Sequence, residues 1–107
     1  MVIPTEDGNP IAVLLGAADH LHRTGSREQA AACYIRALEL LGGTSTESRL
    51  LGYILNQLGC VLRDLGRNEE AVHSLERGLK FLPDSVELLV NLGAAQRSLK
   101  RFKDCLL

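Results

Sequence analysis

Apolar residues recur at every third or fourth position along most of this chain, which is the spacing that lines one face of an α-helix. Leu55, Leu58 and Leu62 show this spacing in the middle of the chain, and Leu89 and Leu92 show it nearer the C-terminal end. The pattern predicts amphipathic helices, each of which turns one face to a common core.

Residues that begin and end helices separate the apolar segments. The expected helices cover residues 10–24, 27–41, 45–65, 69–81 and 85–99, and a further helix begins at 101. The residues that can cap or begin these helices are Asn9 followed by Pro10, Ser26 with Gln29, Thr44 with Glu47, Asn68, and Ser85. The residues that end them are Gly25, Gly42, Gly66 and Pro83. The sequence therefore predicts an all-α protein.

Three segments repeat one pattern of large and small residues. A shift of 34 residues carries Gly59 onto Gly93, together with the leucines around it. The turn glycine of an earlier copy, Gly25, precedes Gly66 of the middle copy by 41 residues, seven more than one repeat. We expect residues 45–51 to be an insertion that extends the following helix.

The repeated residues resemble those of the tetratricopeptide repeat, a helix-turn-helix unit of about 34 residues. The middle copy matches the family pattern best, through Leu58, Gly59, Ala71 and Pro83, while leucine replaces the usual aromatic residue at Leu55, Leu62 and Leu75, and Gly78 replaces an alanine. The resemblance implies a right-handed α-solenoid of paired helices. It divides the chain into a leader at 1–10, a first repeat at 11–44, the insertion at 45–51, a second repeat at 52–85 and a truncated third repeat at 86–107.

Small residues occur where the two helices of each pair are expected to approach closely. The pairs are Ala18 with Ala30, Gly59 with Ala71, and Gly93 with Cys105. We therefore expect Cys105, and Cys33 on another helix, to fill space in the core. We expect Cys60 to project toward the groove of the array.

Composition narrows the classes of function. Twelve Lys and Arg against thirteen Asp and Glu leave a net charge of −1, so the chain lacks the positive excess that nucleic-acid binding requires. Its apolar runs are far shorter than the roughly 20 residues that span a bilayer, so we expect no membrane segment. Three cysteines at unrelated spacings and the absence of a signal peptide favour the cytoplasm, with the nucleus as the alternative.

The chain carries no sequence motif of an enzyme. Phosphate-binding loops, paired cysteines and nucleophile elbows do not occur. His20 and His22 are two residues apart, so on a helix they point in nearly opposite directions and cannot share a metal ion. We expect no catalytic activity, no metal and no cofactor.

The resemblance implies a concave groove lined by the first helix of each pair, at the second, fifth, ninth and twelfth positions of each repeat. These positions hold Ala12, Leu15, Asp19 and His22 in the first repeat, Tyr53, Asn56, Cys60 and Arg63 in the second, and Glu87, Val90, Ala94 and Arg97 in the third. The adjacent sixth positions hold Gln57 and Asn91.

Two features of this set predict a peptide site. His22, Arg63 and Arg97 share one repeat position, so they are expected to form a positive ladder along one edge of the groove. Asn56 and Asn91, together with Gln57, can hydrogen-bond a peptide backbone. The function predicted is a scaffold or adaptor module that binds an acidic peptide or helix of a partner protein. The alternative is that these residues are only solvated polar positions.

The chaperone-binding members of the family hold a terminal carboxylate with Lys, Asn and Arg residues. The matching positions here hold Leu15, Asp19, Gln57, Glu87 and Asn91. Only Gln57 approximates its counterpart, so we expect no binding of the EEVD tails of Hsp70 or Hsp90.

The C-terminal end of the array is expected to leave apolar residues without cover, because each repeat buries its face only against a neighbour. These residues are Leu99, Phe102, Leu106 and Leu107. We expect the chain to be part of a longer array or to take up a partner helix here. The alternative function is structural: self-association through this open end, as a homodimer.

Overall fold

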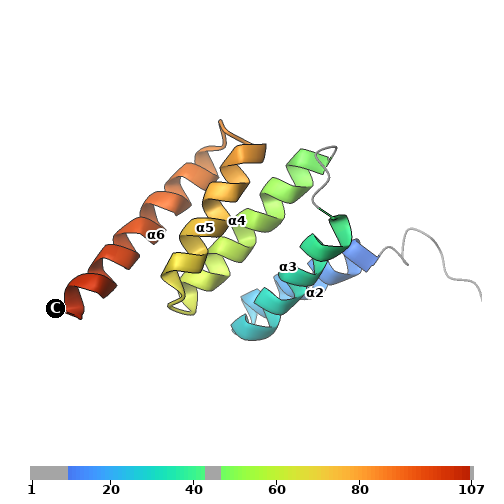
Figure 1. Ribbon diagram of the computed structural model, residues 1–107. Coiled ribbons are helices and arrows are strands. Elements are labelled where there is room, and N and C mark those ends of the chain that lie inside the picture. The colour runs from blue at the N-terminus through green and yellow to red at the C-terminus, as the bar shows by residue number, and fades with distance from the viewer. Residues whose placement is uncertain (1–9, 43–46, 107) are drawn as a thin grey trace, which may run out of the picture.

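The structure, a computed structural model, describes residues 10–42 and 47–106. Within these residues the chain forms five α-helices and no strand. The helices are α2 (Pro10–Arg23), α3 (Arg27–Leu41), α4 (Ser48–Asp64), α5 (Asn68–Phe81) and α6 (Val86–Cys105). The expected all-α architecture is thus confirmed (Figure 1).

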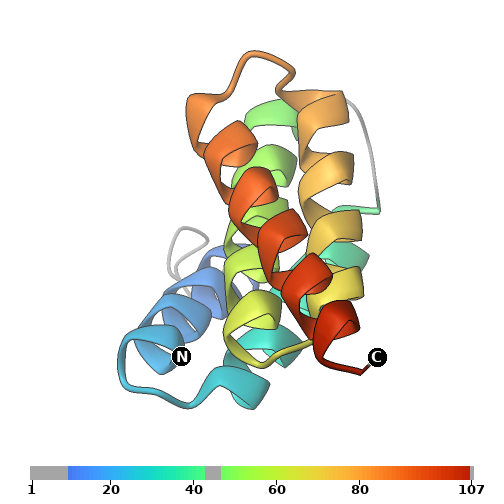
Figure 2. The same cartoon turned by 90° about the vertical axis from the view of Figure 1, so that its left-hand side faces the viewer.

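The helices are arranged as a short solenoid of hairpins. Helices α2 and α3 pack as one hairpin, and α4 and α5 pack as a second that lies against α3. Helix α6 packs on both helices of the second hairpin, as the view from the C-terminal side shows (Figure 2). The first helices of the successive units, α2, α4 and α6, therefore follow one another along the molecule.

Two glycine turns of the same geometry close the two hairpins. Gly25 and Gly66 have φ of +92° and +81°, a left-handed conformation that glycine adopts without a steric penalty. The residue after each glycine donates its backbone N–H to a leucine carbonyl five residues earlier, at 2.8 Å for Ser26 and 2.9 Å for Arg67. These bonds satisfy carbonyls at the helix end and reverse the chain.

The N-terminal caps agree only in part with the sequence prediction. Pro10 begins α2, and Ser85 caps α6 by accepting the backbone N–H of Leu88 at 3.2 Å. Ser26 holds the cap position of α3, but its side chain makes no capping hydrogen bond. Asn68 is the first residue of α5 and not its cap, so that prediction was wrong.

Part of the predicted insertion lies in α4. Of residues 45–51, Ser48 to Leu51 belong to this helix, and Glu47 precedes it without a side-chain capping bond. Asn9 and Thr44 lie outside the described residues.

Helix α6 corrects the predicted break near residue 100. The helix runs without interruption from Val86 to Cys105, so no separate helix begins at 101. Lys100 stands one repeat after Gly66, and it lacks the conformational freedom that lets the glycine turn the chain. Gly93 and Cys105 therefore share one helix instead of facing each other across a pair, and Cys105 is exposed rather than in the core.

The core forms where small residues admit leucines from the neighbouring helix. Ala18 and Ala30 are fully buried, as are Ala71 and Leu75. Gly59 on α4 faces Leu75 of α5: a Cβ atom at this glycine would lie 2.5 Å from Leu75 Cγ. Cys33 packs partly buried against the same core.

Gly78 provides a second close approach, between the second hairpin and α6. A Cβ atom at Gly78 would lie 2.8 Å from Leu88 Cδ2 of α6 and 3.4 Å from Leu55 Cβ of α4. Leu88 is 1% exposed. This leucine therefore anchors α6 in the angle between α4 and α5, and it sets which face of α6 remains open.

We expect Gly59→Ala to lower the free energy of unfolding by about 1–3 kcal/mol, because the new methyl group overpacks the core at Leu75. Gly16→Ala in α2 is the matched control. Nothing lies within 4 Å of its added Cβ. The better helix propensity of alanine should raise stability there by about 0.5–1 kcal/mol. Urea denaturation measures both variants, and an equal effect at the two positions would contradict this packing.

Candidate functional site

The groove residues predicted from the sequence lie on α2, α4 and α6, the first helix of each successive unit. Helix α2 carries Asp19 and His22, α4 carries Tyr53, Asn56, Gln57, Cys60 and Arg63, and α6 carries Val90, Asn91, Ala94 and Arg97. Side-chain hydrogen bonds join α2 to α4 and α4 to α6. The structure thus brings the three helices together along one face, which we call the inner face.

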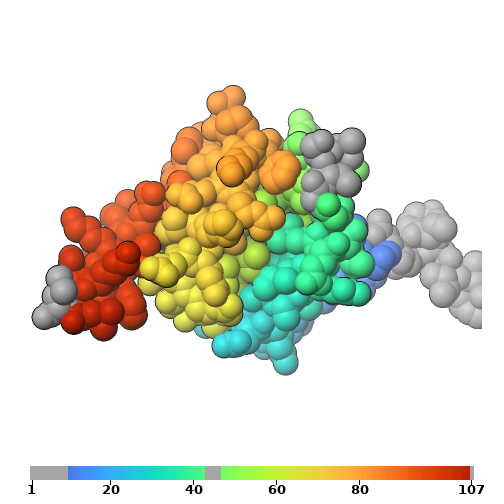
Figure 3. Space-filling view, in the orientation of Figure 1, coloured from blue at the N-terminus to red at the C-terminus, as the bar shows by residue number. Residues whose placement is uncertain are grey.

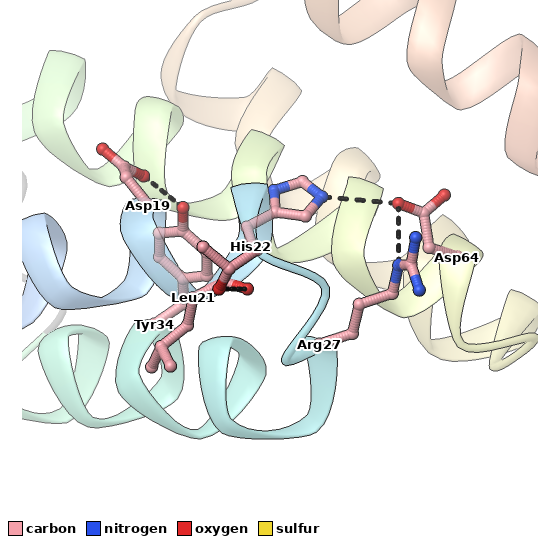
Figure 4. A network of polar contacts seen from close by, with 7 residues as sticks. Asp19, Leu21, His22, Arg27, Tyr34 and Asp64 are labelled. Atoms are coloured by element: carbon pink, nitrogen blue, oxygen red, sulfur yellow. Dashed lines mark hydrogen bonds and ion pairs between the residues drawn. The ribbon is translucent and has the colours of Figure 1, made fainter.

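Asp19 is the centre of a cluster that connects three helices. Its Oδ2 accepts a hydrogen bond from the Tyr53 hydroxyl at 2.9 Å, and its Oδ1 accepts one from the Tyr34 hydroxyl. Figure 4 shows Tyr34 reaching Asp19 from α3. The side chain of Tyr34 is fully buried, whereas Tyr53 is 40% exposed. Both oxygens of this carboxylate are therefore used within the chain.

The environment of the two tyrosines holds them in the neutral form. Burial, reinforced by the hydrogen bond to the Asp19 carboxylate, raises the pKa of Tyr53 to about 12. The same two causes raise the pKa of Tyr34 well above its ordinary value. Each phenol therefore remains a hydrogen-bond donor to Asp19 throughout the physiological range of pH.

His22 is part of an ion-pair cluster and not of a free positive ladder. Its Nε2 lies 3.3 Å from Oδ2 of Asp64, and Nε of Arg27 lies 3.8 Å from the same oxygen. Figure 4 shows both groups converging on Asp64. The cluster connects the end of α2 and the start of α3 to the end of α4.

Amide side chains connect α4 to α6. The Nδ2 of Asn91 donates to Oδ1 of Asn56 at 2.8 Å, and the Nδ2 of Asn56 lies 3.5 Å from the acceptor oxygen of Gln57. Asn56 is 7% exposed. Its amide thus already has partners within the chain, whereas Asn91 and Gln57 remain half-buried at the surface of the inner face.

Arg63 and Arg97 meet in a pocket of about 270 Å³ between the end of α4 and the second half of α6. We call it the arginine pocket; Arg63, Ala94, Arg97, Ser98 and Arg101 line it. The four residues from α6 follow the spacing i, i+3, i+4 and i+7, so they occupy one face of that helix. No described carboxylate lies within ion-pair distance of the three arginines.

Arg101 and Ser98 were missing from the groove residues predicted from the sequence. The prediction ended the fifth expected helix at residue 99, which placed Arg101 on another element. In the continuous helix α6, Arg101 follows Arg97 by one turn and points to the same side. The sequence signal that could have found it is the absence of a turn glycine at Lys100.

Cys60 lies half-buried on the inner face. Burial raises the pKa of its thiol, and the nearby Arg63 offsets this effect only in part. The protonated thiol is a weak nucleophile. Cys60 therefore contributes an apolar contact to the face and not a reactive group, and the exposed Val90 of α6 adds a second apolar surface.

A second hollow, of about 370 Å³, lies between the start of α5 and the end of α6. Leu99, Phe102 and Leu106 line it together with residues 66–70 and Lys103. Phe102 is 54% exposed and Leu106 is 70% exposed. The end of α6 projects from the rest of the surface in Figure 3, and Leu107 lies outside the described residues.

No three His, Cys, Asp or Glu side chains in residues 10–42 and 47–106 are grouped so that they could hold a metal ion. In the same part of the chain, no helix has both the length and the apolar character needed to cross a membrane.

Comparison with known families gives the class of this protein. Residues 10–84, which comprise helices α2 to α5, match the tetratricopeptide repeat family. The chain belongs to this family, whose repeats are typically protein-interaction modules without catalytic activity. A search of curated proteins finds no match. The resemblance seen in the sequence is thus confirmed, and the fold is that of a helical-repeat solenoid.

The tyrosine cluster predicts an unusual alkaline titration. The ultraviolet absorbance of the two tyrosines should titrate well above the ordinary phenol pKa of about 10, with Tyr53 near 12 and Tyr34 later. In urea both should titrate near 10. Because the folded-state pKa values are raised, the cluster's contribution to stability is complete below about pH 10 and falls as the pH rises toward 12.

Tyr53→Phe is the control for this titration. The variant keeps the Tyr34 contact with Asp19, so the one remaining phenol should still titrate far above 10. A folded wild-type protein whose two phenols both titrate near 10 would contradict the cluster.

Proposed function

We propose that this protein is a scaffold or adaptor module that binds a peptide or helix of a partner protein along the inner face. The observation that carries the proposal is the arginine pocket, where Arg63 and Arg97 lie together without a carboxylate partner among the described residues. Tyr53 and Val90, which are 40% and 61% exposed, offer apolar contacts on the same helices.

The charges of the inner face favour a partner segment with acidic residues. Guanidinium groups form their strongest hydrogen bonds with anionic groups, and such bonds gain strength in a partly enclosed pocket. Asp19, Glu87 and Asp64 lie elsewhere on these helices, and the described contacts of Asp19 and Asp64 use them within the chain. The unpaired positive charge at the pocket therefore orients the bound segment, whose acidic end lies at Arg63 and Arg97.

The inner face is organised before a partner arrives. Asp19 holds Tyr53, and Asn91 holds Asn56, so the side chains between the three helices already have one arrangement. A preorganised surface loses less conformational entropy on binding. In this proposal Asp19, His22 and Asn56 support the surface, while Arg97, Val90 and Tyr53 contact the partner.

The test is capture of partners by the tagged wild-type chain and by the double variant Arg63→Glu, Arg97→Glu, quantified by mass spectrometry. We expect the variant to lose the specific partner by about tenfold or more, because charge reversal removes charge-assisted hydrogen bonds. The matched control reverses two exposed charges on α5, Arg77→Glu and Lys80→Glu, and should retain the partner. An EEVD peptide of Hsp70 should not compete.

Equal capture by both double variants would overturn the groove proposal. Circular dichroism of each variant ensures that a loss of capture does not come from unfolding. Both pairs of substitutions change the net charge by the same amount, so a general electrostatic effect would appear equally in both.

A second candidate function is self-association through the end of α6, which the exposure of Phe102 and Leu106 beside the second hollow favours. This candidate predicts a wild-type dimer whose dissociation depends on concentration, measured by sedimentation velocity. Phe102→Gln with Leu99→Gln should give a monomer, because these changes remove the apolar contact. A wild-type chain that stays monomeric at all concentrations would exclude it.

A further inference from the structure

We propose that the arginine pocket receives a phosphorylated side chain of the partner protein. The inference rests on the proposed function of the inner face and specifies the group that the face recognises. It depends on Arg101 and Ser98, which the continuous helix α6 adds to Arg63 and Arg97.

The number of positive charges favours a dianion over a carboxylate. Three arginines surround one pocket of about 270 Å³, and its remaining lining residues are Ala94 and Ser98. A carboxylate carries one negative charge and is satisfied by one bidentate arginine. A phosphorylated side chain carries about −1.5 to −2 charges at pH 7 and presents three acceptor oxygens. The charge of the pocket thus matches the phosphoryl group more closely.

The arginines of the pocket, like Arg23, Arg49 and Arg77, have no carboxylate within ion-pair distance among the described residues, but only in the pocket do three arginines lie around one hollow of the described surface. Arg27, Arg36 and Arg67 each lie within ion-pair distance of a carboxylate. Arg97 and Arg101 have no such partner among the described residues, although they repel each other across one helical turn. An external anion would remove this repulsion.

The helix dipole accounts for the position of Arg63 but not for that of Arg97. Arg63 lies in the last turn of α4, where the helix dipole favours a cation. Arg97 lies two turns before the end of α6, beyond the reach of this effect. The helix dipole therefore does not explain why an arginine stands at position 97.

Small residues leave room for the anion and for the arginine side chains. Arg97 lies back along α6 over Gly93: a Cβ at this glycine would be 3.6 Å from Nη1 of Arg97. Ala94 has the smallest side chain among the lining residues, and Ser98 adds a hydroxyl that can donate to a phosphate oxygen. The planar guanidinium groups provide paired donors that fit phosphate oxygens.

The experiment is a titration of the full chain, followed by amide chemical shifts in NMR, with three probes. The probes are N-acetyl-O-phosphoserine amide, N-acetyl-glutamate amide and inorganic phosphate. We expect the phosphoserine probe to bind at least about tenfold more tightly than the glutamate probe and to shift the amides of residues 94–101. Inorganic phosphate should bind more weakly than the phosphoserine probe.

Three variants test the pocket itself. Arg97→Gln with Arg101→Gln should weaken the phosphoserine probe by about tenfold or more, whereas Arg77→Gln with Lys80→Gln on α5 should leave it unchanged. Ala94→Leu keeps every charge but fills the pocket, so it should also weaken binding. The two arginines are exposed, so their replacement should leave the fold intact.

The outcomes separate this inference from the proposed function. Equal affinity for the glutamate and phosphoserine probes, or equal affinity for inorganic phosphate, would overturn a phosphorylated side chain as the ligand. If no probe binds but the Arg63→Glu, Arg97→Glu variant still loses its partner, the inference fails and the proposed function stands. A further outcome is that the phosphoserine probe binds, but the Arg63→Glu, Arg97→Glu variant captures the same proteins as the Arg77→Glu, Lys80→Glu control. The groove proposal then fails, and so does the inference that the phosphate belongs to a partner protein.

Discussion

The Asp19 carboxylate connects both helices of the first hairpin to the first helix of the second. It accepts one phenol from Tyr34 within the first hairpin and one from Tyr53 on α4. A carboxylate that is partly removed from water requires such partners, since an unpaired one would destabilise the fold. The two hairpins pack on each other through α3 and α4, and the Asp19 cluster together with the hydrogen bond between His22 and Asp64 adds the polar connection between α2 and α4. These polar contacts fix the side chains of the inner face between the two helices.

The second determinant is the continuity of α6. Gly25 and Gly66 turn the chain because they adopt a positive φ, and Lys100 at the corresponding place does not. The helix therefore carries Arg101 past the end of the expected turn and onto the same face as Arg97. One residue type at one repeat position thus decides both the arginine pocket and the exposed end at Phe102.

Much of the fold could be predicted because its signals are local. The spacing of leucines, the turn glycines and the cap at Ser85 all appear within a few residues, and the helices begin and end close to the expected positions. The prediction failed at Asn68, which begins α5 instead of capping it, and near residue 100, where the repeat pattern suggested a turn that no glycine supports. In the candidate site, Arg63 and Arg97 line one pocket, which agrees with their shared repeat position. The sequence did not show that Asp19, His22 and Asn56 form hydrogen bonds with other residues of the chain.

The sequence alone determined the helical repeat, the small residues at Gly59 and Ala18, and the family to which the chain belongs, because a repeat of this kind is written in the spacing of neighbouring residues. Only the tertiary structure decided which polar groups of the inner face remain free. Asp19 and Tyr53 are 34 residues apart, and Asn56 and Asn91 are 35 apart, so their pairing depends on how α2, α4 and α6 pack. The same packing places three arginines around one pocket, because Leu88 seats α6 between α4 and α5 with that face turned outward.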